Sequence, residues 1–410
     1  MSHSPSAWFE VTLHWQSAVA AHCERYFARL EADVVQFPPE LANAMAQLQA
    51  GECCSAAFAA GELVPAWDAA NLKSFPVHLF DGRQRGMQFT PKVGRFYPQG
   101  FAWQALECTR NNFQPLRVIA HTDTELTVDL NHPLACYPLT LTVRSVDTMP
   151  ASQGKAFNGA VHELVTVNGV GLQAPYPGLE TDFYSIYPFT RADERGDNLF
   201  YSNPRFVQHL DKTAIAQVVA WYGRLLQPGM QVLDLMSSWV SHLPVELTVN
   251  VTGLGMNATE LAANPRLSSF VVQDLNANPR LPFADQQFDA VICTVSVEYL
   301  TQPLAVMREL VRVTRAGGWL IMTFSERWFP PKVIELWAEM HPFERLGLVL
   351  DYFRKTQGLD ALHTETIRGL PRPRDDAHSR QMPLSDPLYA VWGRVTTSSP
   401  TTTGLLACGG

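Results

Sequence analysis

Cysteine and concentrated basic charge are both scarce in this 410-residue chain. The seven cysteines cannot all pair internally, and Cys53 and Cys54 have no second pair at the spacing of zinc ligands, so we expect reduced thiols and no metal. The formal net charge of −8 argues against a nucleic-acid partner, because phosphate binding needs a concentrated basic face. The basic cluster at residues 368–374 is broken by prolines and followed by two aspartates, which is typical of a solvated loop.

Long apolar runs are absent as well. No run of about 18 apolar residues occurs, and the N-terminus lacks the basic start and apolar core of a secretion signal. We therefore expect a soluble, cytoplasmic protein without a membrane partner. Hydrophobic residues make up 46% of the sequence, and the length predicts two or three domains with sizeable cores. The oligomeric state stays open.

The first 148 residues contain two different patterns of apolar residues. Apolar residues recur at helical spacing between residues 8 and 60, which predicts a helical segment over residues 1–60. Residues 61–148 contain short alternating runs between turn residues, which is typical of a small antiparallel β domain.

One stretch of this β region is more specific. Residues 128–135 read V-D-L-N-H-P-L-A, and an alternating strand follows. The pattern resembles the C-terminal half of SlyD-like FKBP prolyl isomerases, although Cys136 stands where that family has glycine. The resemblance implies an FKBP-like fold element, in which we interpret His132 as a structural residue.

A connector follows over residues 149–210. It is polar, yet it contains more aromatic residues than a solvated spacer needs, and long ordered connectors are often lids or binding loops. We predict that it packs over the mouth of the next domain. For any single aromatic, an irregular wrap without ligand contact is an equally good interpretation. The aromatic residues are Tyr176, Phe183, Tyr184, Tyr187, Phe189, Phe200, Tyr201 and Phe206.

Residues 211–395 alternate apolar strand-like runs with amphipathic helix-like segments. This alternation predicts an α/β fold, namely a Rossmann-like, doubly wound, mostly parallel sheet covered on both faces. The low-complexity tail of residues 396–410 is predicted to be disordered. Ligands of such a sheet bind outside the carboxyl ends of its strands, so the residues that follow each apolar run are the candidate site.

Polar and small residues follow four of these runs. The first run is followed by Asp234, Met236, Ser237, Ser238 and Trp239, the second by Gly255, Met256 and Asn257, the third by Asp274, Leu275 and Asn276, and the fourth by Val295, Glu298 and Tyr299. With L-P-F-A-D-Q-Q-F-D-A-V at 281–291 and R-A-G-G-W at 315–319, the set resembles the class I S-adenosylmethionine-dependent methyltransferases, type 11 in particular.

The resemblance implies S-adenosylmethionine lying across the strand tips. By position, Asp234 would orient the first loop or bind the methionyl ammonium group. Asp274 would accept a hydrogen bond from the adenine amino group, while Leu275 and Met256 would cover the two faces of the ring. Asp274 equally suits a helix or turn cap.

Two departures from the family put cofactor binding in question. Its glycine-rich first loop is replaced by a glycine-free turn, and Gly255 stands where the family has an acidic residue for the ribose. The replacements are nevertheless orderly, since the hydroxyls of Ser237 and Ser238 can donate hydrogen bonds as backbone amides do, and Asn257 could bind the ribose. The loop resembles a divergent subgroup with D-L-M-S-S-W-V-S-H-L-P. We favour retained binding over a fold that has lost it. The three glycine places hold Met236, Ser238 and Val240.

The predicted function is in-line methyl transfer to a small molecule, which needs alignment and a base. Arg205 suits a carboxylate or phosphate on the acceptor, whereas Glu298 could instead serve a helix N-terminus and His242 could be structural. The alternatives are a non-catalytic scaffold protein and, less favoured, a prolyl isomerase or chaperone. The catalytic candidates are Glu298, Tyr299, Tyr201 and His242, and the acceptor candidates are Tyr201, Asn203 and Arg205.

Overall fold

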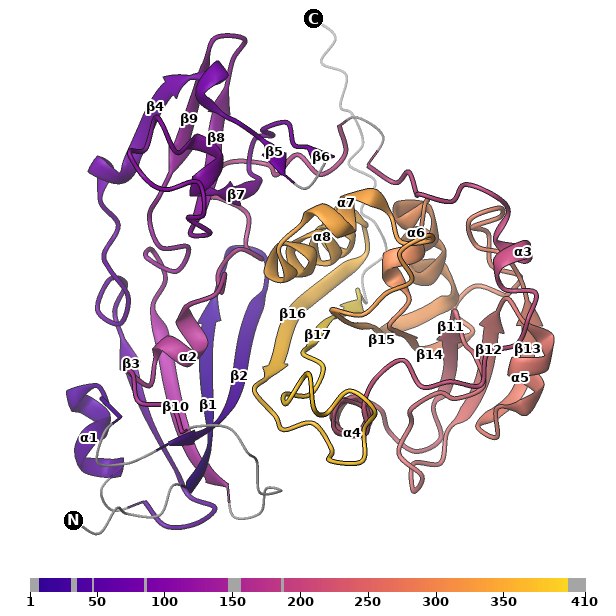
Figure 1. Cartoon of the computed structure of the whole chain (residues 1–410). Helices are drawn as coiled ribbons and strands as arrows, with labels where there is room; N and C mark the ends of the chain where they lie inside the picture. The colour runs from indigo at the N-terminus through magenta and orange to yellow at the C-terminus, as the bar shows by residue number, and fades with distance from the viewer. Residues whose placement is uncertain are drawn as a thin grey trace, which may run out of the picture.

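The computed structural model describes residues 7–30, 35–45, 48–84, 87–146, 156–185 and 188–396 (Figure 1). Tyr187 and residues 397–410, on which two of the expectations fall, lie outside these ranges. An N-terminal lobe of strands stands beside a C-terminal lobe of strands and helices (Figure 1), and one eleven-stranded sheet runs through both, in the order β13-β12-β11-β14-β15-β17-β16-β2-β1-β10-β3.

The C-terminal lobe has the predicted α/β architecture. Its parallel strands are β11 (Gln231–Leu235), β12 (Asn250–Gly255), β13 (Leu267–Val272), β14 (Phe288–Thr294) and β15 (Thr314–Ser325), and β17 (Leu388–Val395) runs antiparallel between β15 and β16 (Leu359–Arg368). Its helices are α4 (Lys212–Leu225), α5 (Ala258–Ala263), α6 (Pro303–Val313), α7 (Glu335–Glu339) and α8 (Pro342–Lys355).

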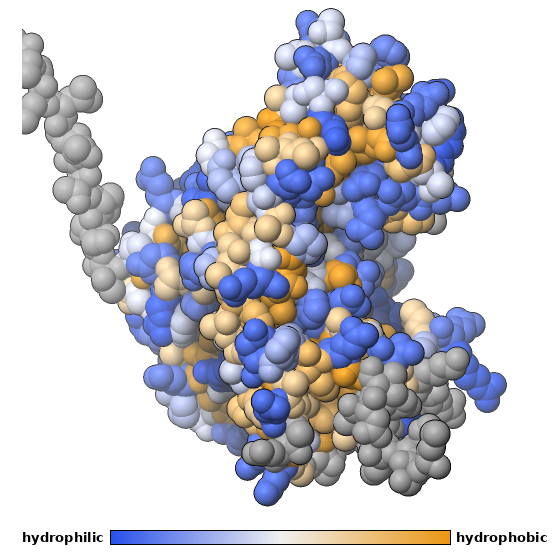
Figure 2. Space-filling model, turned by 90° about the vertical axis from the view of Figure 1, so that its left-hand side faces the viewer, coloured by the Kyte–Doolittle hydropathy of each residue, from blue (hydrophilic) through white to orange (hydrophobic). Residues whose placement is uncertain are grey.

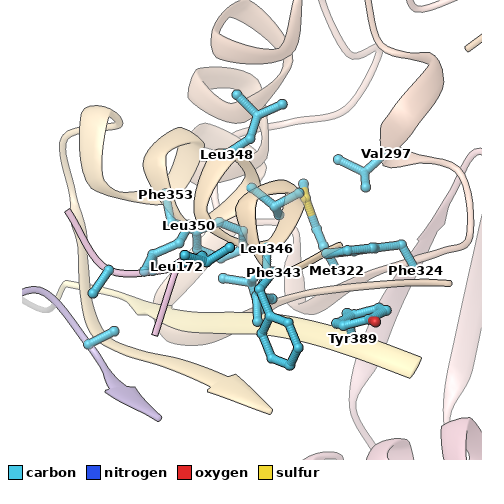
Figure 3. Close-up of a cluster of buried hydrophobic side chains, with 14 of the residues drawn as sticks. Leu172, Val297, Met322, Phe324, Phe343, Leu346, Leu348, Leu350, Phe353 and Tyr389 are labelled. Atoms are coloured by element: carbon cyan, nitrogen blue, oxygen red, sulfur yellow. The ribbon is translucent and has the colours of Figure 1, made fainter. Parts of the chain in front are cut away.

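Both faces of this sheet are buried, which explains why its strands read as continuous apolar runs. Successive residues of a strand point to opposite faces, so Val232 packs in one core with α4 while Leu233 packs in the other with α6 and α8. Figure 3 shows the second core, where Phe343 and Leu346 of α8 lie over the strand residue Met322.

The helical segment predicted over residues 1–60 is wrong. Strands β1 (Ala7–Gln16) and β2 (Ala21–Leu30) form an antiparallel hairpin, and β3 (Cys53–Phe58) lies further along the sheet. In β1 every second residue from Phe9 to Trp15 is buried, the period of a strand. In the described part of this segment, only α1 (Pro39–Met45) is an α-helix.

The β region predicted at residues 61–148 is divided between two sheets. Strands β3 and β10 (Leu139–Val146) belong to the large sheet, since β10 pairs with both β1 and β3. His132 has a structural role as expected, because its ring accepts the Leu134 amide and bonds the carbonyl of Thr166, which ends α2 (Glu163–Thr166). A separate sheet contains β4 (Leu72–Pro76), β7 (Phe96–Pro98), β8 (Pro115–His121) and β9 (Glu125–Asp129), and β5 (Arg83–Gln84) with β6 (Met87–Gln88) forms a short ribbon.

The two lobes are joined by strand pairing and by buried charge. Strand β2 pairs in parallel with β16, so the large sheet is continuous across the junction. Arg95 next to β7 donates from Nε to Glu344 of α8 at 2.5 Å, and both side chains are buried. The face of the N-terminal lobe mixes hydrophobic and hydrophilic residues (Figure 2). No helix in the described ranges is long and apolar enough to cross a membrane.

Candidate active site

A pocket of about 250 Å³ opens at the carboxyl ends of the parallel strands. Its wall includes every residue that the sequence placed at the strand tips for cofactor binding: Asp234, Met236, Ser237, Ser238, Trp239, Gly255, Met256, Asn257, Asp274, Leu275, Asn276 and Val295. Four of the catalytic and acceptor candidates also line it, namely Tyr201, Arg205, His242 and Tyr299. The structure therefore brings together residues from four strand tips and the connector.

Two predicted residues lie outside this wall. Asn203 is exposed to solvent and does not line the pocket, so its predicted acceptor contact is not supported. Glu298 is fully buried behind the wall, and neither of its carboxylate oxygens has a hydrogen-bond partner. Burial raises the pKa of Glu298 to about 8, so its carboxyl is largely protonated at neutral pH. The prediction that Glu298 is the catalytic base is therefore wrong, because the group reaches no acceptor in the pocket.

The loop after β11 adopts glycine-like backbone conformations without glycine. Met236 has φ +56° and His242 has φ +48°, both in the left-handed region that glycine usually occupies. At the tip of β14, the β-branched Val295 has φ +44°, where such residues are genuine outliers. Each such residue costs about 1–3 kcal/mol and persists only where its surroundings enforce it. Three of these residues line the pocket, and Glu107, Asn168, Gln286 and Ala361 have positive φ elsewhere in the chain.

The two serines of the loop hold it against its neighbours. The Ser237 amide donates to the Leu254 carbonyl at 2.7 Å, and the Ser237 hydroxyl donates to Asp234 at 2.6 Å. The Ser238 hydroxyl donates to Glu260 at 2.6 Å. Both hydroxyls thus donate hydrogen bonds to carboxylates of the protein. To bind a ligand in place of backbone amides, they would have to exchange these bonds for bonds to the ligand.

The surroundings of Gly255 explain why no acidic residue stands at the tip of β12. A Cβ built on Gly255 would lie 2.1 Å from the Ser237 carbonyl oxygen, far inside any tolerable contact. The glycine-free loop packs against the tip of β12, and only glycine at position 255 leaves room for the Ser237 carbonyl. An acidic side chain at position 255 is incompatible with this loop conformation.

A carboxylate nevertheless lines this part of the pocket, and sequence reasoning missed it. Glu260 in the first turn of α5 accepts from the Ser238 hydroxyl and, at 2.7 Å, from the Arg205 amide. Asn257 accepts hydrogen bonds from the amides of Thr259 and Glu260 and so caps α5. The spacing N-x-x-E resembles a capping box, which is the sequence signal that could have drawn attention to Glu260.

Asp234 holds the loop through a hydrogen bond from the Ser237 hydroxyl. It is buried at the end of β11, and this burial raises its pKa to about 6, although the hydroxyls of Ser237 and Ser241 oppose the shift. The bond from the Ser237 hydroxyl ties Asp234 to the first loop, and the role of Asp234 in orienting that loop for a ligand stays a prediction. Its contact with a methionyl ammonium stays a prediction.

Asp274 has one oxygen engaged and one available. Its Oδ1 accepts from the amides of Asn276 and Ala277 at 2.9 and 3.2 Å, which is the turn-cap role considered above. No hydrogen bond to Oδ2 occurs in the described part of the chain, so this atom can accept from a ligand amine. Both roles of Asp274 are therefore compatible.

Asn257 and Asn276 fix segments of the wall. The Asn257 side chain donates to the carbonyls of Tyr201 and Ser202 at 2.9 and 3.2 Å, which ties the connector to α5. Asn276 donates to Asp197 at 2.8 Å and to the Tyr299 carbonyl at 2.9 Å. A ribose bond from Asn257 would compete with these contacts, so we assign both asparagines to the framework.

Connector residues between α3 (Asp197–Phe200) and residue 210 line the pocket, and the role of the connector as a lid stays a prediction. The Arg205 guanidinium carbon lies 4.2 Å from the centre of the Phe200 ring and 5.3 Å from that of Phe329, and its Nη2 donates to the Phe200 carbonyl. Asp197 anchors the segment through ion pairs with Arg191 at 2.8 Å and with the buried Lys332 at 3.1 Å. The connector is held in place on the pocket from both ends.

The remaining candidates for the catalytic base differ in their hydrogen bonds and in the direction of their pKa shifts. The Tyr299 hydroxyl accepts from the Phe329 amide at 2.9 Å, and burial raises the pKa values of both Tyr299 and Tyr201. His242 lines the pocket, and burial, with a smaller effect of His209, lowers its pKa to about 4. A neutral imidazole therefore faces the pocket at pH 7. His209, which the sequence reasoning did not single out, lines the same wall.

Comparison with known proteins agrees with this geometry. Residues 238–322 match the model of the methyltransferase domain family. The demethylmenaquinone methyltransferase of Beutenbergia cavernae is 35% identical over 134 residues, and that of Renibacterium salmoninarum is 32% identical over 110 residues. These alignments cover 31% and 25% of this chain, and 50% and 45% of the relatives, so the chain spans about half the length of the curated relatives it matches.

The chain also resembles a solved structure at low sequence identity. The S-adenosylmethionine-dependent methyltransferase of Thermotoga maritima is 14% identical, with 44% of this chain and 88% of that chain covered and a TM-score of 0.32.

Proposed function

We propose that the C-terminal region of this chain, which matches the methyltransferase domain family over residues 238–322, binds S-adenosylmethionine and transfers its methyl group to a small-molecule acceptor bound beneath the connector. One observation carries the proposal. The strand-tip pocket keeps a free carboxylate oxygen on Asp274, a second carboxylate on Glu260 and a neutral imidazole on His242 along a single wall.

The residues present fit the cofactor. Asp274 Oδ2 is free to accept a hydrogen bond from the adenine amino group, and Met256 and Leu275 lie in the wall beside it. Glu260 replaces the missing acidic residue of β12 as the acceptor for the ribose hydroxyls, in exchange for the Ser238 hydroxyl. Asp234 and the loop to which it is bonded would hold the methionine end.

The acceptor side of the pocket supplies a cation and a base. When bound, the cofactor supplies an electrophilic methyl group on a sulfonium. The residues of this chain would hold the acceptor's nucleophilic atom in line with that methyl group. His242 takes the proton that a protonated nucleophile must lose, since its imidazole is neutral at pH 7. Arg205 is placed to pair with an anionic group of the acceptor.

The names of the two curated relatives suggest a chemical class for the acceptor. Both are demethylmenaquinone methyltransferases. We propose an aromatic acceptor of the quinol type, because Tyr201, Phe329 and Trp328 line the pocket and offer faces for a flat ring.

Asp274→Asn tests the proposal. Asparagine keeps an acceptor oxygen for the amides of Asn276 and Ala277 but removes the second oxygen and the charge. We expect a similar melting temperature and a dissociation constant for S-adenosylhomocysteine at least about tenfold higher by calorimetry. Equal affinity of the variant would refute the adenine contact. Absence of binding to the unmodified protein would favour the non-catalytic scaffold.

A further inference from the structure

We propose that the methyl acceptor is amphipathic, and that its apolar part leaves the pocket across a rim formed by Phe206, Val207 and Trp239. This inference rests on the proposed function and names the kind of acceptor. The three residues come from two segments far apart in sequence, the connector and the loop after β11.

The rim is apolar and exposed. Phe206 is 50% exposed and the adjacent Val207 is 53% exposed, although most large apolar side chains among the described residues are buried. The rings of Phe206 and Trp239 lie 6.1 Å apart at an angle of 73°, and Trp239 Nε1 donates to the Val207 carbonyl at 3.3 Å. The rim is thus a defined contact between the two segments rather than three scattered side chains.

The rim is continuous with the pocket. Val207 and Trp239 contribute to the pocket wall as well as to the rim. An apolar group that extends from the pocket would therefore cover surface that is otherwise exposed to water, which is favourable by about 25 cal/mol per Å². Exposed apolar surface joined to a pocket commonly marks a ligand groove.

The interior of the pocket supplies the opposite polarity. Arg205 is surrounded by the rings of Phe200, Tyr201 and Phe329, with centroids 4.2, 5.7 and 5.3 Å from its guanidinium carbon. Its one side-chain hydrogen bond in the described part of the chain goes to the Phe200 carbonyl, so other donors remain for a ligand. A polar or anionic aromatic head would bind inside, and an aliphatic chain would leave over the rim.

A pair of matched variants tests the rim. The probes are 1,4-naphthoquinones that carry no isoprene unit or three, titrated by calorimetry into the full chain saturated with S-adenosylhomocysteine. We expect the tailed probe to bind the unmodified protein at least about tenfold more tightly. Phe206→Ser should reduce this ratio to near one. Phe270→Ser should keep it, because Phe270 is 40% exposed on β13 and does not line the pocket.

The possible failures are distinguishable. If S-adenosylhomocysteine does not bind, the proposed function fails. If it binds but the two probes bind equally, or neither binds, or Phe206→Ser leaves the ratio unchanged, the inference about the rim is overturned. Sedimentation of the chain without ligand provides a further check, since a dimer that Phe206→Ser dissociates would assign the rim to a second copy.

Discussion

Replacing Gly255 by alanine should damage the cofactor site through one contact. The new Cβ would lie 2.1 Å from the Ser237 carbonyl oxygen and 3.2 Å from the Leu261 side chain. The Leu261 side chain can adjust, but the carbonyl belongs to the backbone of the loop. The loop must therefore retreat by roughly 1 Å to restore an ordinary contact.

The cost of that retreat follows from the bonds that hold the loop. Overpacking of a buried site costs about 1–3 kcal/mol, and the hydrogen bonds from Ser237 to Leu254 and Asp234 contribute about 1 kcal/mol each. The free energy of unfolding should fall by about 3–5 kcal/mol in total. Binding of S-adenosylhomocysteine should be lost, because the displaced loop forms part of the pocket wall.

Denaturant unfolding and calorimetric titration measure the two effects. Gly223→Ala in α4 is the matched control, since its Cβ would meet only the Pro244 side chain at 3.2 Å and alanine is favoured in a helix by about 1 kcal/mol. Wild-type stability and affinity in Gly255→Ala would refute the claim that the loop depends on this glycine.

Three further predictions concern buried titratable groups. Because the native pKa of Glu298 is about 8, well above its unfolded value, this group stabilises the fold below pH 4.5 and loses that contribution as the pH rises through 8. In Glu298→Gln, the free energy of unfolding measured in urea should therefore depend less on pH between pH 5 and 8.5. For His242 the native pKa of about 4 lies below the unfolded value, so the stability of the fold decreases as the pH drops below 6.5. His242→Gln should lower kcat by about 10²–10⁴-fold and remove the acidic limb of the pH–rate profile near pH 4. Wild-type turnover in the variant would exclude His242 as the base. Glu344→Ala should cost about 3–5 kcal/mol in urea unfolding because it leaves the Arg95 guanidinium buried without its partner, and a loss below 1 kcal/mol would contradict a shared core between the lobes.

The sequence predicts the C-terminal lobe well because its strands are buried on both faces. Runs such as residues 231–235 and 288–294 then read as continuous apolar segments, and their ends locate the site. For the N-terminal strands, the spacing of apolar residues alone wrongly predicts a helix. In β1, Trp8, Val11 and Trp15 fit a helical spacing as well as they fit part of a strand, and only pairing with β2 and β10 decides between the two.

Residue types at the site were predictable, but their hydrogen bonds were not. Ser238 lines the pocket, but its hydroxyl donates to Glu260, which lies in a different element. Asn257 was expected to bind ribose, whereas it holds the connector. Such partners are set by tertiary packing between segments distant in sequence. His209 was missed because no pattern distinguishes a histidine in a connector from a solvated one.

The FKBP resemblance at residues 128–135 stays a prediction. The structure gives His132 a structural role there, through its contacts with Leu134 and Thr166. Strand β10, which follows this motif, is part of the large sheet that reaches the methyltransferase region. The N-terminal lobe is therefore joined to that region by more than a linker.

The most direct test asks whether the glycine-free loop still supports cofactor binding. Isothermal titration of S-adenosylmethionine into the unmodified full chain measures it. We predict a one-to-one isotherm with a micromolar dissociation constant, and loss of that isotherm in Gly255→Ala but not in Gly223→Ala. Absence of any binding at millimolar S-adenosylmethionine would contradict the account, and would mean that Ser237 and Ser238 hold together a site that no longer takes its ligand.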